Sequence, residues 1–414
     1  MQRILIRTIS LLFVLCFISQ LTSCKENSST EPEVDSKVTK WEEDINYFDS
    51  ELKSKQYKFS SLISIQRYNN AITDIKNSID SLRDYEIYLK LQQLVASFNV
   101  AHIVLYASSQ LNFHLLPFYT YSFSDGIYII MADQNNSNLL GKKIIGYGGE
   151  PIKTVEDSLR KIISYENDYW FKEQLPKALS NVEVLKYYGF TSSLSSVDID
   201  IEGIGKVTVN SVESAPGMNH ILDGKIVPLY LQNQSSNYWD TFIEANRVLF
   251  IKYNKCSNAI NFPFTDFTNV VKEFISSHQV DKVVIDLRNN GGGNSSIINP
   301  LLDYLKSSSF NQAGKLFIAV NRGTFSSALL NSISFSQQTN CILVGEPTGG
   351  KPNSYGEVLT FTLPNSQTKV QYCKKYFQTM SEDPEALFPD HSIEITFGEY
   401  INCKDPVIDF ILDY

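Results

Sequence analysis

The sequence predicts an α/β protein with a mostly parallel βα core, an N-terminal helical layer and a small β-rich region between them. From about Val227 onward, short apolar runs alternate with helical stretches, which is typical of strands covered by helices on both faces. Between residues 41 and 97 the apolar residues recur at helical spacing. Residues 123–152 and the short runs VDIDI and KVTVN show strand-like patterns.

Composition limits the class of protein and of partner. The chain has 414 residues and 43% hydrophobic content, which is enough for a large buried core and for two or three units. The formal net charge is −9, and no basic block occurs in the chain. These features argue against a nucleic-acid partner.

The first residues predict export and lipid attachment. Arg3 and Arg7 precede an apolar run at residues 9–18, and Leu-Thr-Ser-Cys follows, ending at Cys24. This end resembles a bacterial lipobox, so we expect residues 1–23 to be a signal peptide and Cys24 to carry the lipid. Polar residues 24–40 then form a tether, and the protein faces the periplasm or the cell surface at the lipid bilayer. The alternative is an uncleaved anchor helix.

Beyond Cys16 and Cys24, four cysteines are left: Cys256, Cys341, Cys373 and Cys403. Their spacing fits neither a metal site nor a CxxC redox motif, so no metal is expected. Export permits disulfides among them, and buried free thiols are an equal alternative.

The predicted core strands cover residues 248–254, 282–288, 315–321 and 341–346, with helices at 264–278 and from Ser326. Another helical stretch, residues 155–179, is expected to break near Pro176. Three unusual segments leave the predicted strand ends: NNGGGNSS, RGTFSSALLNS and PTGGKPNSYGE. Ligands gather beyond the carboxyl ends of parallel strands, and glycine runs let backbone N–H groups approach an anion. We therefore expect the functional site here.

Ser326 is the candidate nucleophile, because a serine at a strand-to-helix turn can meet both a base and amide donors for an oxyanion. The alternative is a helix N-cap serine. Lys351 is one candidate base, which requires its pKa to fall by about three units from about 10.4. It could instead be an exposed lysine. A phosphate loop is disfavoured because Pro352 replaces the Ser or Thr that binds magnesium, so no nucleotide is expected.

His102 is the other candidate base, lying among apolar residues in SFNVAHIVLY. A histidine in such a setting is either catalytic or a packed core residue. The four remaining histidines have no comparable context: His114, His220, His278 and His391.

With these segments in place, the chain resembles the C-terminal processing peptidases, also called tail-specific proteases, and their tricorn-core and retinoid-binding-protein relatives. The motifs are VVIDLRNNGGGNS, NRGTFSSALL and GEPTGGK. The resemblance runs from about Trp41 to the end and is strongest from Val248. It implies a crotonase-like core and an exported serine endopeptidase that cleaves protein or peptide substrates through an acyl-enzyme, without a cofactor.

The resemblance also implies roles for single residues. Ser326 matches the nucleophile and Lys351 the general base, while Gly292, Gly293 and the amide of Ser327 match the oxyanion hole. Asp286 and Arg288 match strand-end supports. Two positions depart from the family pattern, because Leu329 replaces an acidic residue and Tyr355 replaces a glutamine. The tricorn branch takes its base from the region of His102, so the pairings of Ser326 with Lys351 and with His102 both stay open.

Residues 139–152 resemble the second half of a PDZ-like module without a recognisable carboxylate-binding loop. We therefore expect a helical region at 41–115, a degenerate PDZ-like, β-rich region at 116–215 and an α/β peptidase core at 216–414. A non-catalytic protein that binds peptides or hydrophobic ligands on the same fold is the main rival. An α/β-hydrolase is disfavoured because neither candidate serine lies in a G-x-S-x-G elbow.

Overall fold

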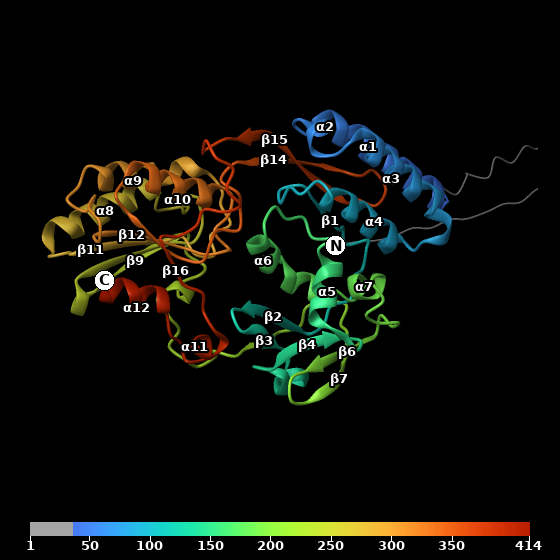
Figure 1. Cartoon of the computed structure of the whole chain (residues 1–414), viewed down its shortest axis with the longest axis horizontal. Helices are drawn as coiled ribbons and strands as arrows, with labels where there is room; N and C mark the ends of the chain where they lie inside the picture. Colours follow the sequence, from blue (N-terminus) through green and yellow to red (C-terminus); the bar gives the residue numbers. More distant parts are fainter. Residues whose placement is uncertain (1–35) are drawn as a thin grey trace, which may run out of the picture. The chain divides into compact units, whose positions relative to one another are not determined.

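The computed structural model describes residues 36–414, so the predicted signal peptide and Cys24 lie outside the described residues. The chain begins with the predicted helical layer (Figure 1), made of α1 (Lys37–Lys55), α2 (Phe59–Leu62), α3 (Ile65–Asn77) and α4 (Asp84–Ala96). The apolar positions Trp41, Ile45 and Phe48 are buried, as their helical spacing predicts. In this part of the chain, no helix has the length and apolarity that a membrane span needs.

The predicted βα core is a six-stranded sheet with the order β16-β13-β12-β11-β10-β9. Its strands are β9 (Tyr238–Ile243), β10 (Val248–Tyr253), β11 (Lys282–Asp286), β12 (Leu316–Val320), β13 (Ile342–Gly345) and β16 (His391–Ser392). Neighbouring strands run parallel except β9, which is antiparallel to β10. Every residue of β10 and β12 is buried, which explains the continuous apolar runs in the sequence.

Helices cover both faces of this sheet (Figure 1). Alternate strand residues such as Leu249 and Ile251 pack with α8 (Phe264–Ser277), α9 (Asn299–Lys306) and α10 (Ser327–Gln338). The intervening residues, such as Phe250, pack with α12 (Pro406–Asp413) on the other face. Since the strands are parallel, the loops that follow β11, β12 and β13 leave one edge of the sheet together.

A second sheet is antiparallel and has the order β2-β3-β4-β6-β7, with β5 beside β4 and β8 beside β3. Its strands are β2 (Phe118–Phe123), β3 (Gly126–Ala132), β4 (Lys143–Tyr147), β5 (Glu150–Pro151), β6 (Ser196–Ile201), β7 (Gly205–Asn210) and β8 (Asn219–His220). The helices of this region are α5 (Ile152–Leu159), α6 (Asp168–Leu179) and α7 (Val182–Tyr187), and α11 (Phe397–Ile401) follows near the end of the chain.

The predicted helix break near Pro176 is wrong. The helical stretch breaks between α5 and α6, and Pro176 lies inside α6. The break forms because the side chain of Asn167 accepts a hydrogen bond from the Trp170 N–H and starts a new helix. Pro176 lies close to the C-terminal end of α6, where the missing N–H removes one hydrogen bond without ending the helix.

A third sheet was not predicted from the sequence. It has the order β1-β15-β14 and consists of β1 (Val104–Tyr106), β14 (Ser354–Thr362) and β15 (Lys369–Phe377). The antiparallel hairpin β14–β15 continues from the segment that contains Lys351, and β1 follows His102 directly. Through β1, β15 and β14, this sheet therefore joins the segment after His102 to the segment after Lys351.

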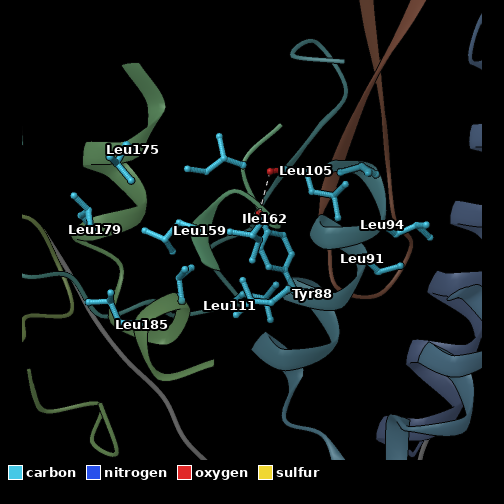
Figure 2. Close-up of a cluster of buried hydrophobic side chains, with 14 of the residues drawn as sticks. Tyr88, Leu91, Leu94, Leu105, Leu111, Leu159, Ile162, Leu175, Leu179 and Leu185 are labelled. Carbon is cyan, nitrogen blue, oxygen red and sulfur yellow. Dashed lines mark hydrogen bonds between the residues drawn. The ribbon is translucent and has the colours of Figure 1, made fainter. Parts of the chain in front are cut away.

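The region around β1 shares one hydrophobic core with α4, α5, α6 and α7 (Figure 2). The buried side chains labelled there come from these elements and the loops between them: Tyr88, Leu91, Leu94, Leu105, Leu111, Leu159, Ile162, Leu175, Leu179 and Leu185. The Tyr88 hydroxyl donates a hydrogen bond to the carbonyl oxygen of Leu105 at 2.9 Å. The backbone beside His102 is therefore held by a packed apolar cluster.

Buried charges lie at the carboxyl end of β11, where Asp286 and Arg288 were expected as supports. Asp286 is fully buried and pairs with Lys252 at 3.3 Å and with Arg288 at 2.5 Å. Arg288 also pairs at 2.7 Å with Asp405, the residue that caps α12. The four cysteines of the described chain are free thiols.

Candidate active site

Ser326 occupies the turn between β12 and α10. Its backbone has φ 53° and ψ −124°, an uncommon conformation for a residue with a side chain. Ser326 is the N-cap residue of α10, yet its side chain makes no cap hydrogen bond. Ser326 therefore occupies the N-cap position, as the alternative predicts, but its hydroxyl does not cap the helix.

The glycine-rich loop after β11 packs closely against this turn. A Cβ on Gly292 would lie 2.8 Å from the Ser327 nitrogen and 2.9 Å from the Ser326 Cβ, so only glycine fits. The Ser327 hydroxyl donates to the Gly293 carbonyl at 2.6 Å and fastens the two segments. The Gly292 N–H already donates to Asn290 Oδ1 at 2.9 Å. An oxyanion hole would accordingly use the amides of Gly293 and Ser327.

One cavity of about 300 Å³ brings four of the predicted site residues together: Ser326, Ser327, Gly293 and His102. The remaining lining consists of Asn294, Ser295, Leu330, residues 354–358 and Phe377. Lys351 and Gly292 are not among the lining residues. A nucleophile, a possible proton acceptor and a first-turn helix amide, which has no intrahelical acceptor, thus surround one space.

His102 is buried, with 7% of its surface exposed. Its ring stacks on Phe325 at 4.4 Å between centroids, and Phe325 stacks in turn on Trp170 at 3.8 Å. Within the described residues, neither ring nitrogen has a hydrogen-bond partner. Burial lowers the pKa of His102 to about 4, because the apolar surroundings disfavour the charged ring. The imidazole is therefore neutral at neutral pH.

Lys351 has a different environment. Its Nζ lies 2.7 Å from Asp383 Oδ2, and 24% of its side chain is exposed. An ion pair with a carboxylate stabilises the charged ammonium, whereas a general base must be neutral. The geometry therefore favours His102 over Lys351 as the partner of Ser326.

Glu166 lies between the two candidate bases and was not singled out from the sequence. Its Oε1 atom is buried without a hydrogen-bond partner among residues 36–414, and the carboxyl group lies near the backbone amides of Lys351 and Ala101, which favour its charged form. Burial raises the pKa of Glu166 to about 8. This carboxyl group therefore links the segment before His102 to the segment that contains Lys351.

Replacing Glu166 by glutamine should remove a pH dependence of stability. Because the folded-state pKa of Glu166 is raised, its ionisation costs stability progressively as the pH rises from about 4.5 to about 8. At pH 9, Glu166→Gln should raise the free energy of unfolding by about 1–3 kcal/mol, with little change at pH 4. Urea unfolding at both pH values measures this. The exposed Glu382→Gln is the matched control, and equal changes in both variants would contradict the assignment.

The sequence analysis missed the residues of β14 that line the cavity, and the partners of the His102 ring. Tyr355, Gly356 and Val358 belong to the strand-like run SYGEVLTFT. A second strand-like run, KVQYCKKYF, follows it, and two such runs in succession are a hairpin signal. No local signal marks the stack of Trp170, Phe325 and His102, because it joins three distant segments. Among residues 36–414, no three His, Cys, Asp or Glu side chains come close enough to hold a metal ion.

Comparison with known proteins supports the fold. No protein-family model and no curated protein sequence matches the chain. Mature CPAF in complex with lactacystin matches with a TM-score of 0.62 and 12% identity over 90% of this chain and 97% of that chain. Mature CPAF alone gives a TM-score of 0.59, 12% identity and coverages of 90% and 96%.

A putative S41 protease from Bacteroides fragilis NCTC 9343 is similar at 12% identity, with a TM-score of 0.44 over 89% of this chain and 96% of that chain. The inference about the fold rests on these two CPAF structures, since they superpose on this chain more closely. They also match over nearly the whole length of both proteins. The chain therefore shares the fold of mature CPAF.

Proposed function

We propose that this protein is a serine peptidase that hydrolyses peptide bonds through an acyl-enzyme on Ser326, with His102 as the general base. The observation that carries the proposal is the shared cavity, which Ser326, His102, Gly293 and Ser327 all line. The fold shared with CPAF supports the same class of reaction. Proteins or peptides are the substrates, and no cofactor takes part.

The reaction needs one proton acceptor and two amide donors. The Ser326 hydroxyl oxygen attacks the substrate carbonyl carbon while its proton passes to a ring nitrogen of His102. The carbonyl oxygen becomes an oxyanion, which the N–H groups of Gly293 and Ser327 stabilise. When the C–N bond breaks, His102 returns the proton to the leaving amine. Water then gives a proton to His102 and attacks the ester carbonyl, the bond from the acyl carbon to the Ser326 oxygen breaks, the carboxylic acid product leaves, and His102 returns the proton to Ser326.

Lys351 acts as a structural residue in this proposal. Its ion pair with Asp383 fastens the loop before β14 to the segment after β15, and β14 lines the Ser326 cavity. Gly292 has a corresponding role, because its missing side chain allows the close contact with Ser326. In this proposal, the motif after β12 supplies the nucleophile and the Ser327 amide, the glycine-rich motif supplies the Gly293 amide, and the motif after β13 supplies part of the cavity wall.

The proposal also includes the cellular setting. Cleavage of residues 1–23 and lipid attachment at Cys24 would hold the peptidase at the bacterial cell envelope. The antiparallel sheet of β2, β3, β4, β6 and β7 would be the degenerate PDZ-like region, and the six-stranded sheet the crotonase-like core.

A serine-reactive phosphonate tests the nucleophile directly. Incubation with the purified protein should give a single adduct, which peptide mapping by mass spectrometry assigns to Ser326. Ser326→Ala should give none, and Ser334→Ala, on the same helix, should still be labelled. An adduct on another serine would refute the assignment.

A further inference from the structure

A second cavity lies against His102. Its volume is about 470 Å³, and it is lined by Tyr88, Leu105, Phe113, Ile162, Ile163 and Val184 among other residues. Figure 2 labels Tyr88, Leu105 and Ile162, which lie together at the centre of the buried cluster. A pocket of this size with a mainly apolar lining is typical of a ligand site.

The wall of this apolar pocket includes the aromatic stack. Trp170, Phe325 and His102 all line it, and His102 also lines the Ser326 cavity. The two cavities thus share His102 as a lining residue. Phe325 precedes the nucleophile in the chain, so the pocket adjoins the reaction centre on two segments.

We propose that this apolar pocket receives a bulky apolar side chain of the peptide substrate, one or two residues from the scissile bond. The inference rests on the proposed function. An extended peptide rises about 3.3 Å per residue. Because the two cavities share His102 and are lined by the neighbouring residues Phe325 and Ser326, a side chain one or two residues from a carbonyl at Ser326 comes within reach of the pocket.

The lining determines which side chain is accepted. A basic side chain would lose its hydration among Phe113, Ile162 and Ile163 without gaining a counter-ion there, because the charged residue of the lining is Lys177. Leucine, phenylalanine and methionine gain from burial. Polar groups are also present in the lining, and Lys177 Nζ donates to Gln174 Oε1 at 3.1 Å. These groups can face the polar backbone of the same substrate residue.

The first experiment uses a set of fluorogenic peptides that place Ala, Leu, Phe or Lys at each of the two positions on either side of the scissile bond. At one position, kcat/KM should be at least about tenfold higher for Leu or Phe than for Ala, and lowest for Lys. Equal rates for all four residues at every position would overturn the inference.

A pocket-filling variant links this preference to the cavity. Ala178 on α6 lines the pocket, so Ala178→Phe should lower the Phe-to-Ala ratio of kcat/KM by about tenfold or more. Lys172→Phe places the same ring on the exposed part of α6 and should leave the ratio unchanged. Thermal unfolding of both variants establishes that they fold. Equal ratios in a folded Ala178→Phe variant and the wild type would refute the pocket assignment.

Binding without turnover separates this inference from the proposed function. In Ser326→Ala protein, a peptide with the preferred Phe should change the fluorescence of Trp170, and the Ala peptide should bind at least about tenfold more weakly. The Trp170→Phe variant identifies the signal. If Ser326→Ala still cleaves peptides, the proposed function fails. If Ser326 is required but both peptides bind equally, only the pocket inference fails.

Discussion

Replacing Ser326 by alanine should lower kcat/KM for a peptide substrate by about 10⁴-fold or more, because the proposed acyl-enzyme forms on this hydroxyl. The loss should come without unfolding, since the Ser326 side chain makes no cap hydrogen bond and lines a cavity. Peptide hydrolysis and thermal unfolding, measured on the same preparation, test both parts.

The matched control for this variant is Ser334→Ala. Ser334 lies on α10, two turns beyond Ser326, and its hydroxyl donates to the Leu330 carbonyl within the helix. Its loss should change kcat/KM by less than about twofold. Wild-type turnover by a folded Ser326→Ala protein would show that the nucleophile lies elsewhere.

Replacing His102 by glutamine should reduce kcat/KM by about 10³-fold or more, whereas Lys351→Met should reduce it by less than about tenfold. Glutamine keeps a planar polar group in the stack on Phe325 but cannot take up the proton of Ser326. Lys351→Met removes the ion pair with Asp383, which supports the cavity wall from outside. The reverse order of the two losses would assign the base to Lys351.

The pH dependence of kcat/KM is an independent test of whether His102 or Lys351 is the base. Since burial lowers the pKa of His102 to about 4, kcat/KM should be constant above about pH 6 and fall below about pH 4 as the ring takes up a proton. The stability of the folded protein should fall with decreasing pH as well, because of His102. The unfolded chain binds this proton from about pH 6.5 downward while the folded protein resists it, so stability is lost as the pH falls towards 4. An alkaline rise in kcat/KM would instead indicate a lysine base.

The core strands and their ends could be predicted from the sequence because continuous apolar runs allow few other structures. Val283, Ile285 and Ile318 are buried on one face of the parallel sheet, and Val284 and Phe317 are buried on the other. Parallel neighbours end at the same edge, so the glycine loop and Ser326 had to meet. Gly292 came instead from the family resemblance, as an oxyanion-hole residue, and its close approach to Ser326 was not predicted.

The choice of base could not be predicted in this way. Lys351 pairs with Asp383, which follows an intervening hairpin that the sequence analysis did not identify. The environment of His102 depends on Phe325 and Trp170, which come from two other parts of the chain. The pKa of a side chain is set by such three-dimensional neighbours, so a motif alone left both bases possible.

The ion pairs of Arg288 tie the glycine loop to the last helix of the chain. Asp405 both caps α12 and neutralises Arg288, which is buried beside Asp286. A chain that stops before residue 405 would leave a buried guanidinium with one counter-ion fewer, at a cost of about 3–5 kcal/mol. A nascent polypeptide therefore completes the scaffold behind Ser326 only after synthesis has passed that carboxylate.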